Sequence, residues 1–225
     1  MELDYVMRTT PATRTFTDDP VPDDVLYDIL EVARFAPNGG NRQGWKVIVV
    51  RDQPTKDRIN ELYDLGFREY AGFMRAGLVP FQALGADKRD REPIDLEEAR
   101  NTPLDAPQSL IAQAPVLLVI VLDLENVSAV DAGLGRLSIS AGGSVYPFAH
   151  NILLAARNRG FGGHVTSVLA RQEPALRELL GIPENYILAT MLPIGKPPKE
   201  ITKLRRIAVE EFTSIGRFDG PPLTK

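Results

Sequence analysis

Apolar residues recur on one side of a helix over residues 23–36. They stand three or four positions apart, at Val25, Leu26, Ile29, Leu30, Ala33 and Ala36. This is the spacing of one helix face that packs on a core. Asp23 and Asp24 favour the positive end of the helix dipole. Pro22 precedes the segment and Pro37 follows it, so the pattern predicts a helix over 23–36.

Three short apolar runs have the β-branched character of buried strands. They cover residues 46–50, 114–124 and 186–195. Two further stretches, 144–159 and 174–180, carry apolar residues at helical spacing and are followed by Gly160 and Gly181, where glycine commonly ends a helix. Strands that alternate with helices predict a layered sandwich of the α+β or α/β class.

Residues 66–107 differ from the rest, because they mix glycine, proline and dense charge. We interpret them as a partly helical insertion, either a lid over a binding site or a solvated connection. The length of 225 residues and the hydrophobic content of 44% favour one domain, 1–225, that carries this insertion.

The composition of the chain argues against several classes of partner and of site. With 26 Lys and Arg against 30 Asp and Glu, the net charge of -4 predicts no general attraction to nucleic acid or to an anionic membrane. The absence of Cys excludes disulfides, thiolate catalysis and cysteine-bound metals, and two His make a multi-histidine metal site improbable. No secretory signal or long apolar run is visible, so we expect a cytoplasmic protein with a small-molecule partner.

Three segments carry candidate binding chemistry. In "APNGGNRQGW", 36–45, glycines permit close approach to a planar or anionic ligand, although a helix cap and turn with amides that satisfy the loop is an equally simple interpretation. "MRTTPATRTF", 7–16, offers guanidinium groups and hydroxyls to a phosphate, or forms a plain polar arm. "KPPKEITKLRR", 196–206, is basic, as solvated tails often are.

A fourth segment, "GFGGHVTSV" at 160–168, is rich in glycine but matches neither the dinucleotide-binding nor the P-loop pattern. We expect His164 in this loop to be exposed and His150 to pack inside a helix. Ser144, Ser167 and the histidines form no nucleophile elbow, which argues against a hydrolase.

These segments together resemble the nitroreductase family of FMN-dependent oxidoreductases. The resemblance rests on "RTT…RTF", "ARFAPNGGNRQGW", "GGSVYPFAHNILLAARNRGFGG" and "LRELLGIP…LPIGKPP…KLRR", which follow one another along nearly the whole chain. It implies an α+β fold, a nitroreductase-like α/β/α sandwich whose mixed sheet is flanked by helices. It also implies an intertwined homodimer with two FMN sites at the subunit interface.

The resemblance assigns the flavin ring to two segments. One set of residues reaches a flavin that is bound mainly by the other subunit. It consists of Pro37, Asn38, Gly39 and Asn41 on the loop, and Ser144 near the start of the long helix. Those near the N5 edge are Val165, Thr166 and Ser167. No catalytic side chain and no metal is implied, because the chemistry belongs to the cofactor.

The resemblance assigns the FMN phosphate to both ends of the chain. The residues are Arg8 and Thr10 from the amino end, and Lys203 and Arg205 from the basic tail. Arg14 is an alternative to Arg8, and Arg206 is an alternative to Arg205.

The activity implied is an FMN-dependent NAD(P)H oxidoreductase. NADH or NADPH reduces the flavin and leaves, and a nitroaromatic, a quinone or a related small electron acceptor then enters the same cleft. Two alternatives stay open: a protein that stores flavin with little turnover, and a specialised member that performs reductive dehalogenation or flavin fragmentation.

Overall fold

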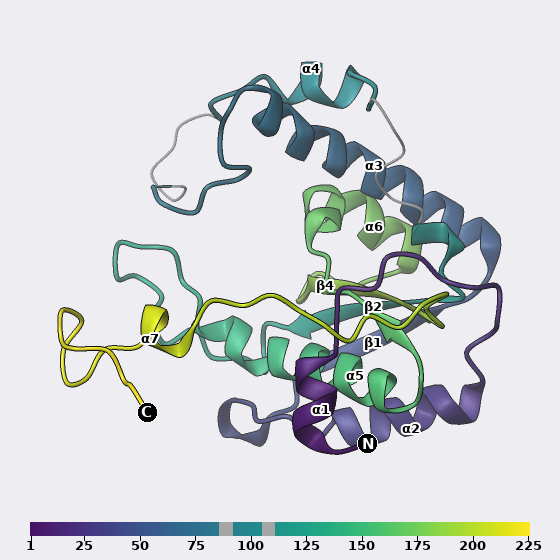
Figure 1. Ribbon diagram of the computed structural model, residues 1–225. Coiled ribbons are helices and arrows are strands. Elements are labelled where there is room, and N and C mark those ends of the chain that lie inside the picture. Colours follow the sequence, from purple (N-terminus) through teal and green to yellow (C-terminus); the bar gives the residue numbers. More distant parts are fainter. Residues whose placement is uncertain (86–91, 105–110) are drawn as a thin grey trace.

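Strand β2, Val116–Asp123, is buried over its whole length and lies at the centre of the fold (Figure 1). The computed structural model describes residues 1–85, 92–104 and 111–225. One face of the sheet carries helices α3 (Gln53–Arg75) and α6 (Glu173–Leu180), and the other carries α2 (Asp23–Ala33) and α5 (Tyr146–Asn158). The expected α/β/α sandwich of the α+β class is therefore confirmed.

The sheet holds four strands in the order β1-β2-β4-β3. The other strands are β1, Trp45–Val50; β4, Tyr186–Gly195; and β3, Gly162–Gly163. All neighbours pair antiparallel, and among the described residues the only parallel pairing is an isolated bridge between Ala12 and Gly163. The mixed sheet that the resemblance implied is thus wrong for the named strands, which pair antiparallel throughout.

Successive residues of β2 point to opposite faces of the sheet, so one strand serves two cores. Val116, Leu118, Ile120 and Leu122 join the core under α2 and α5. Leu117, Val119 and Val121 join the core on the other face. None of these side chains is more than 2% exposed. An antiparallel sheet often keeps one face solvated; here the continuous apolar run requires helices on both faces.

The predicted helices and strands are found, with shifted ends. Helix α2 stops at Ala33 rather than at residue 36, and Arg34 is its C-cap. The helix predicted over 144–159 is α5, which begins at Tyr146, because Ser144 is the last residue of a preceding 3₁₀ helix, η4 (Ser140–Ser144). Gly181 ends α6 in the left-handed conformation, with φ of 63°, as its position predicted.

The region between β1 and β2 is more regular than expected. Residues 66–75, which we assigned to the insertion, belong to α3. Gly66 lets α3 pack closely on the 3₁₀ helix η5 (Val168–Gln172), because a Cβ at Gly66 would lie 2.8 Å from the Val168 carbonyl oxygen. Helix α4, Leu96–Asn101, follows, and the parts of the predicted insertion at 86–91 and 105–110 lie outside the described residues.

A fully buried carboxylate joins α4 and η5 to α3. Glu69 accepts from Arg100 Nε at 2.5 Å and from Arg171 Nε at 2.7 Å, and it is 0% exposed. A buried charge is costly unless it is paired, so the two arginines are needed where they lie. The position of α4 is therefore tied to the same helix that supports η5.

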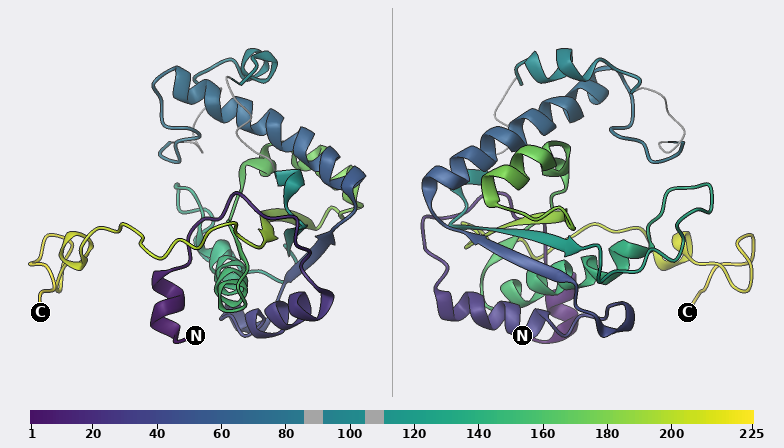
Figure 2. Two further views of the ribbon diagram at one scale, coloured as in Figure 1. Left: turned by 45° about the vertical axis from the view of Figure 1, so that its right-hand side comes forward. Right: turned by 180° about the vertical axis from the view of Figure 1, so that it is seen from behind.

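The two ends of the chain lie on the α5 side of the sheet (Figure 1). Helix α1, Leu3–Arg8, packs beside α5, and the Met1 amino group donates to Asn158 Oδ1 at 2.8 Å. After β4 the chain continues as residues 197–225, the C-terminal arm, which holds the short helix α7 (Val209–Phe212). Figure 2 shows this arm projecting away from the sandwich.

Candidate functional site

The bend between α2 and β1 contains four of the predicted ring contacts. Its turn η1, Gly39–Asn41, gives Gly40 and Asn41 φ values of 62° and 53°, which glycine and asparagine tolerate. Asn38 Oδ1 accepts from the Gln43 N–H at 2.9 Å, and Asn38 Nδ2 donates to a carbonyl of the same bend. The Asn38 amide therefore satisfies backbone hydrogen-bonding groups of the loop, as the alternative interpretation of this segment predicted.

Ser144 lies against this bend although it is distant in the sequence. The Gly39 N–H donates to Ser144 Oγ at 3.2 Å. Pro37, Gly39 and Asn41 are exposed beside this contact. Tertiary structure thus brings together the segments 37–41 and 140–144, which the resemblance assigned to one side of the flavin ring.

Asp131, which we did not predict from the sequence, fixes the loop that leads to Ser144. Its carboxylate accepts from the hydroxyls of Ser140 and Ser138 and from the Ile139 N–H, and it pairs with Arg136 at 2.7 Å. These hydrogen bonds, that from Ser140 first, hold the pKa of Asp131 well below its usual range. The only signal in the sequence is an acid followed by two nearby serines.

The segment 165–167 has one exposed face and one anchored face. Val165 and Ser167 are exposed, whereas Thr166 is buried and exchanges both backbone hydrogen bonds with Met191 of β4 at 3.0 Å. Thr166 Oγ1 donates to the Tyr63 hydroxyl of α3 at 3.2 Å, and burial raises the pKa of Tyr63. The backbone predicted to face the flavin N5 edge is therefore held by both β4 and α3.

Both expectations for the histidines are wrong. His164 is buried, and its Nδ1 lies 2.8 Å from the Thr13 carbonyl oxygen, to which a protonated Nδ1 donates. Burial lowers the pKa of His164, and the positive charge of Arg14 adds to this effect. His150 is exposed, because it falls on the outer side of α5. His164 was missed because the amino-terminal segment that covers it is far away in the sequence.

Cations from the two ends of the chain share one hollow. A cleft of about 710 Å³ is lined by three cations, Arg8, Lys203 and Arg206, and by one acid, Asp4. Its uncharged lining residues are Met7, Thr202 and Leu204. Arg8 ends α1, and the other two cations belong to the C-terminal arm. Guanidinium and ammonium groups from separate segments are the arrangement that binds a phosphate dianion. Arg205 does not line this cleft.

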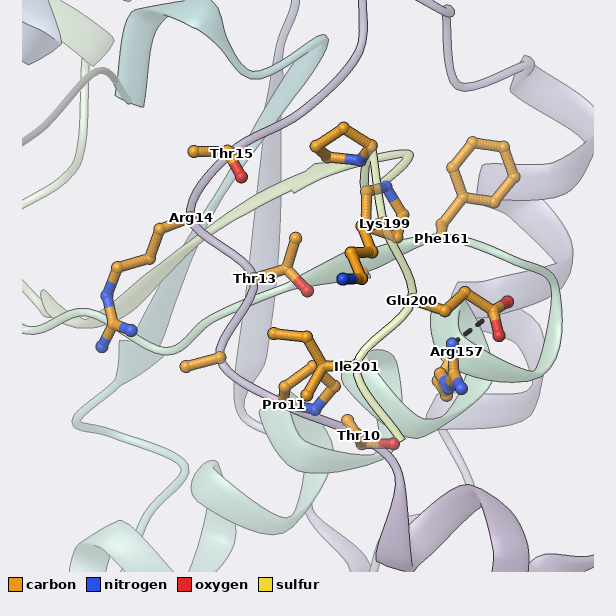
Figure 3. Close-up of a pocket in the computed structure, with 14 residues that line it drawn as sticks. Thr10, Pro11, Thr13, Arg14, Thr15, Arg157, Phe161, Lys199, Glu200 and Ile201 are labelled. Carbon is orange, nitrogen blue, oxygen red and sulfur yellow. Dashed lines mark ion pairs between the residues drawn. The ribbon is translucent and has the colours of Figure 1, made fainter. Parts of the chain in front are cut away.

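A second cavity, of about 280 Å³, lies between the amino-terminal segment and the start of the arm (Figure 3). Thr13 and Lys199 point toward one another across it, whereas Arg14 points away from them on the other side of the chain. Thr10 also borders this cavity, and its hydroxyl donates to the Val6 carbonyl at 2.7 Å. Thr10 and Arg14 therefore lie outside the cleft that Arg8 shares with the arm.

Within the described residues, no hydrogen bond or ion pair joins the ring segments 37–41 and 140–144 to the cationic cleft. Nor does the described part of the chain contain a cluster of three or more His, Asp or Glu side chains that could hold a metal ion. Among the helices of the described ranges, none combines the length and the apolar character needed to cross a membrane.

The three-layer sandwich and the glycine-bearing bend define the class, an α+β protein of the type that the sequence motifs indicated. The chain belongs to the Nitroreductase family, whose model matches residues 7–196. Among curated proteins, a chloronitrobenzene nitroreductase from Comamonas testosteroni is 24% identical over 95% of this chain and 96% of that protein. An iodotyrosine deiodinase from Nematostella vectensis is 28% identical over 92% of this chain and 72% of that protein.

A solved structure shares the fold. The crystal structure of oxidized iodotyrosine deiodinase bound to FMN and 3-iodo-L-tyrosine superposes with a TM-score of 0.67 at 20% identity. The superposition covers 96% of this chain and 100% of that chain. Membership of this family makes the chain a flavin-dependent oxidoreductase in the general sense.

The buried His164 predicts a pH-dependent stability. Its folded pKa is lowered from the usual value of about 6.5, so below that pH the unfolded chain takes up a proton that the folded chain does not. The melting temperature of the protein should therefore fall from about pH 7.5 to about pH 5, and it should fall less in His164→Gln. Equal slopes in the wild type and in His164→Gln would contradict a lowered pKa of the buried His164.

Proposed function

We propose that this protein is an FMN-dependent oxidoreductase that uses NADH or NADPH to reduce a small acceptor, such as a nitroaromatic or a quinone. The single observation that carries the proposal is the cleft where Arg8 meets Lys203 and Arg206, in a chain of the Nitroreductase family. Three cations against one acid, Asp4, suit the dianionic end of FMN.

The residues of this chain would bind and orient the cofactor. Arg8 and Lys203 would hold the phosphate together with Arg206, and the geometry favours Arg206 over Arg205. The backbone of 165–167 and the exposed Val165 side chain would lie along the ring, and the bend at 37–41 with Ser144 would approach it from a partner subunit. Bound FMN would supply hydride transfer between the nicotinamide and the acceptor.

A homodimer is part of the proposal. The C-terminal arm exposes large apolar side chains, which are Ile201, Ile207, Val209, Phe212, Ile215, Phe218 and Leu223. Phe218 is fully exposed, and a series of such residues on a projecting segment favours burial against another surface. Strand β1 lies at an edge of the sheet and offers one place where a second copy can pair.

Two other functions keep specific support. A flavin-storage protein fits a strong cofactor pattern without a defined acceptor site. A dehalogenating or flavin-fragmenting enzyme fits the similarity to iodotyrosine deiodinase, with the segment after α3 as a lid that selects the substrate. The proposed lid is coupled to the ring segment, because α3 contacts Thr166 through Tyr63 and carries Glu69, which pairs with Arg100 of α4.

The first test is optical. Protein purified with FMN should be yellow, and anaerobic addition of NADH or NADPH should bleach it within the time of a turnover, after which a nitroaromatic or quinone should restore the colour. Absence of any FMN-induced spectral change or thermal stabilisation would refute the proposal. Flavin binding without bleaching would favour storage, and product analysis after incubation with a halogenated phenol or with oxygen would identify the specialised reactions.

Phosphate recognition can be tested by comparing FMN with riboflavin, which lacks the phosphate. Arg8→Ala, Lys203→Ala and Arg206→Ala should each weaken FMN binding about tenfold, the value of one charge-assisted hydrogen bond, and leave riboflavin binding unchanged. Arg159→Ala removes a cation outside the cleft and serves as the control. A selective loss in Arg205→Ala or Arg14→Ala, with Arg206→Ala or Arg8→Ala unaffected, would transfer the role to those residues.

Truncation after Arg206 tests the dimer. Because this change removes the exposed apolar residues of the arm from Ile207 onward but keeps the cleft cations, sedimentation equilibrium should show a dimer for the full chain and a monomer for the truncated chain. A full chain that is monomeric while it retains FMN would contradict the shared-site proposal.

A further inference from the structure

Arg157 carries a buried charge in the last turn of α5. Its side chain is only 4% exposed, although arginine is rarely buried without partners. A cation in the last turn favours the negative end of the helix dipole, but a guanidinium also needs acceptors for its N–H groups. The role of this buried charge therefore depends on which groups Arg157 contacts.

Those partners come from opposite ends of the chain. Arg157 Nε donates to Thr9 Oγ1 at 3.3 Å, and Arg157 Nη1 lies 3.4 Å from Glu200 Oε1 (Figure 3). Arg157 Nη2 is buried and has no hydrogen-bond partner among the described residues. Thr9 follows Arg8 directly, and Glu200 precedes Lys203 by one short segment of the arm. One side chain thus contacts both segments that supply the cationic cleft.

The arm has little other polar attachment. The Thr17 N–H donates to the Lys196 carbonyl at 2.9 Å, just before the arm begins. Beyond that point, the pair of Arg157 with Glu200 is the only ion pair or hydrogen bond between residues 197–225 and the rest of the described chain. Among the described residues, this pair is therefore the one polar contact that restrains the arm between Lys196 and Lys203.

We propose that Arg157 is a positioning residue, which joins the end of α1 to the arm so that Arg8, Lys203 and Arg206 converge on the phosphate of FMN. The inference rests on the proposed function, because it assumes that the cleft receives that phosphate. Arg157 itself does not line the cleft; it acts through Thr9 and Glu200.

Glu200 provides a discriminating test, because two possible roles of its charge predict opposite effects on FMN binding. A carboxylate near a phosphate site repels the phosphate, so simple electrostatics predicts that FMN binds more tightly when Glu200 is neutralised. If Glu200 holds the arm in place, its neutralisation instead weakens FMN binding. Glu200 is 57% exposed, so Glu200→Gln should fold normally.

The experiment is a titration of the full-length apoprotein with FMN and with riboflavin. Glu200→Gln should weaken FMN binding by about threefold or more, within the range of a partly exposed ion pair, and should leave riboflavin binding unchanged. Arg157→Met should weaken FMN binding by at least as much. The matched controls are Glu178→Gln, an exposed acid on α6, and Arg159→Met, at the residue that caps the end of α5; both should bind the two flavins as the wild type does.

A second readout does not involve flavin. Trypsin cuts after Lys203, Arg205 and Arg206 should be several-fold faster in Glu200→Gln than in the wild type, as followed by mass spectrometry, because the arm is less restrained. Unchanged or tighter FMN binding by Glu200→Gln, or equal weakening of FMN and riboflavin, would overturn the positioning role. A wild type that binds FMN no better than riboflavin would instead refute the phosphate cleft itself, and the inference with it.

Discussion

The complete burial of β2 is the constraint from which the rest of the architecture follows. Its side chains enter one core on each face of the sheet, so helices must cover both faces, and α2 with α5 and α3 with α6 do so. Apolar side chains of β2 contribute stability roughly in proportion to the area they remove from water. The chain ends and the loops between these layers are left on the surface, which is where most of the candidate binding residues lie.

Buried polar groups then fix those surface segments to the sandwich. Asp131 orders the loop before Ser144, Tyr63 and Met191 hold Thr166, and Arg157 contacts both terminal segments. In each case a polar group that is costly to bury acquires a specific partner, and the partner belongs to a segment with a proposed binding role. The scaffold therefore determines the geometry of the site through a few polar contacts rather than through the core alone.

The similarity to both a nitroreductase and a deiodinase is consistent with this separation between the sandwich and the surface segments. Flavin chemistry belongs to the cofactor, and the protein contributes position, charge and exclusion of water. Under the proposed function, the sandwich and the cationic cleft serve the cofactor. In that proposal, the acceptor is selected by segments outside the sheet, above all by the region that α3 carries, where Glu69 connects α4 to η5.

The sequence by itself determined the layered class, the main strands and helices, and the segments at 7–16, 36–45 and 196–206 as candidate binding regions, because apolar periodicity and local motifs are properties of neighbouring residues. Only the tertiary structure decided the antiparallel pairing, the burial of His164, and the choice of Arg8 and Arg206 to share a cleft with Lys203. These features depend on contacts between residues far apart in the chain. No local pattern encodes such contacts, and the covering of His164 by the Thr13 carbonyl is the plainest example.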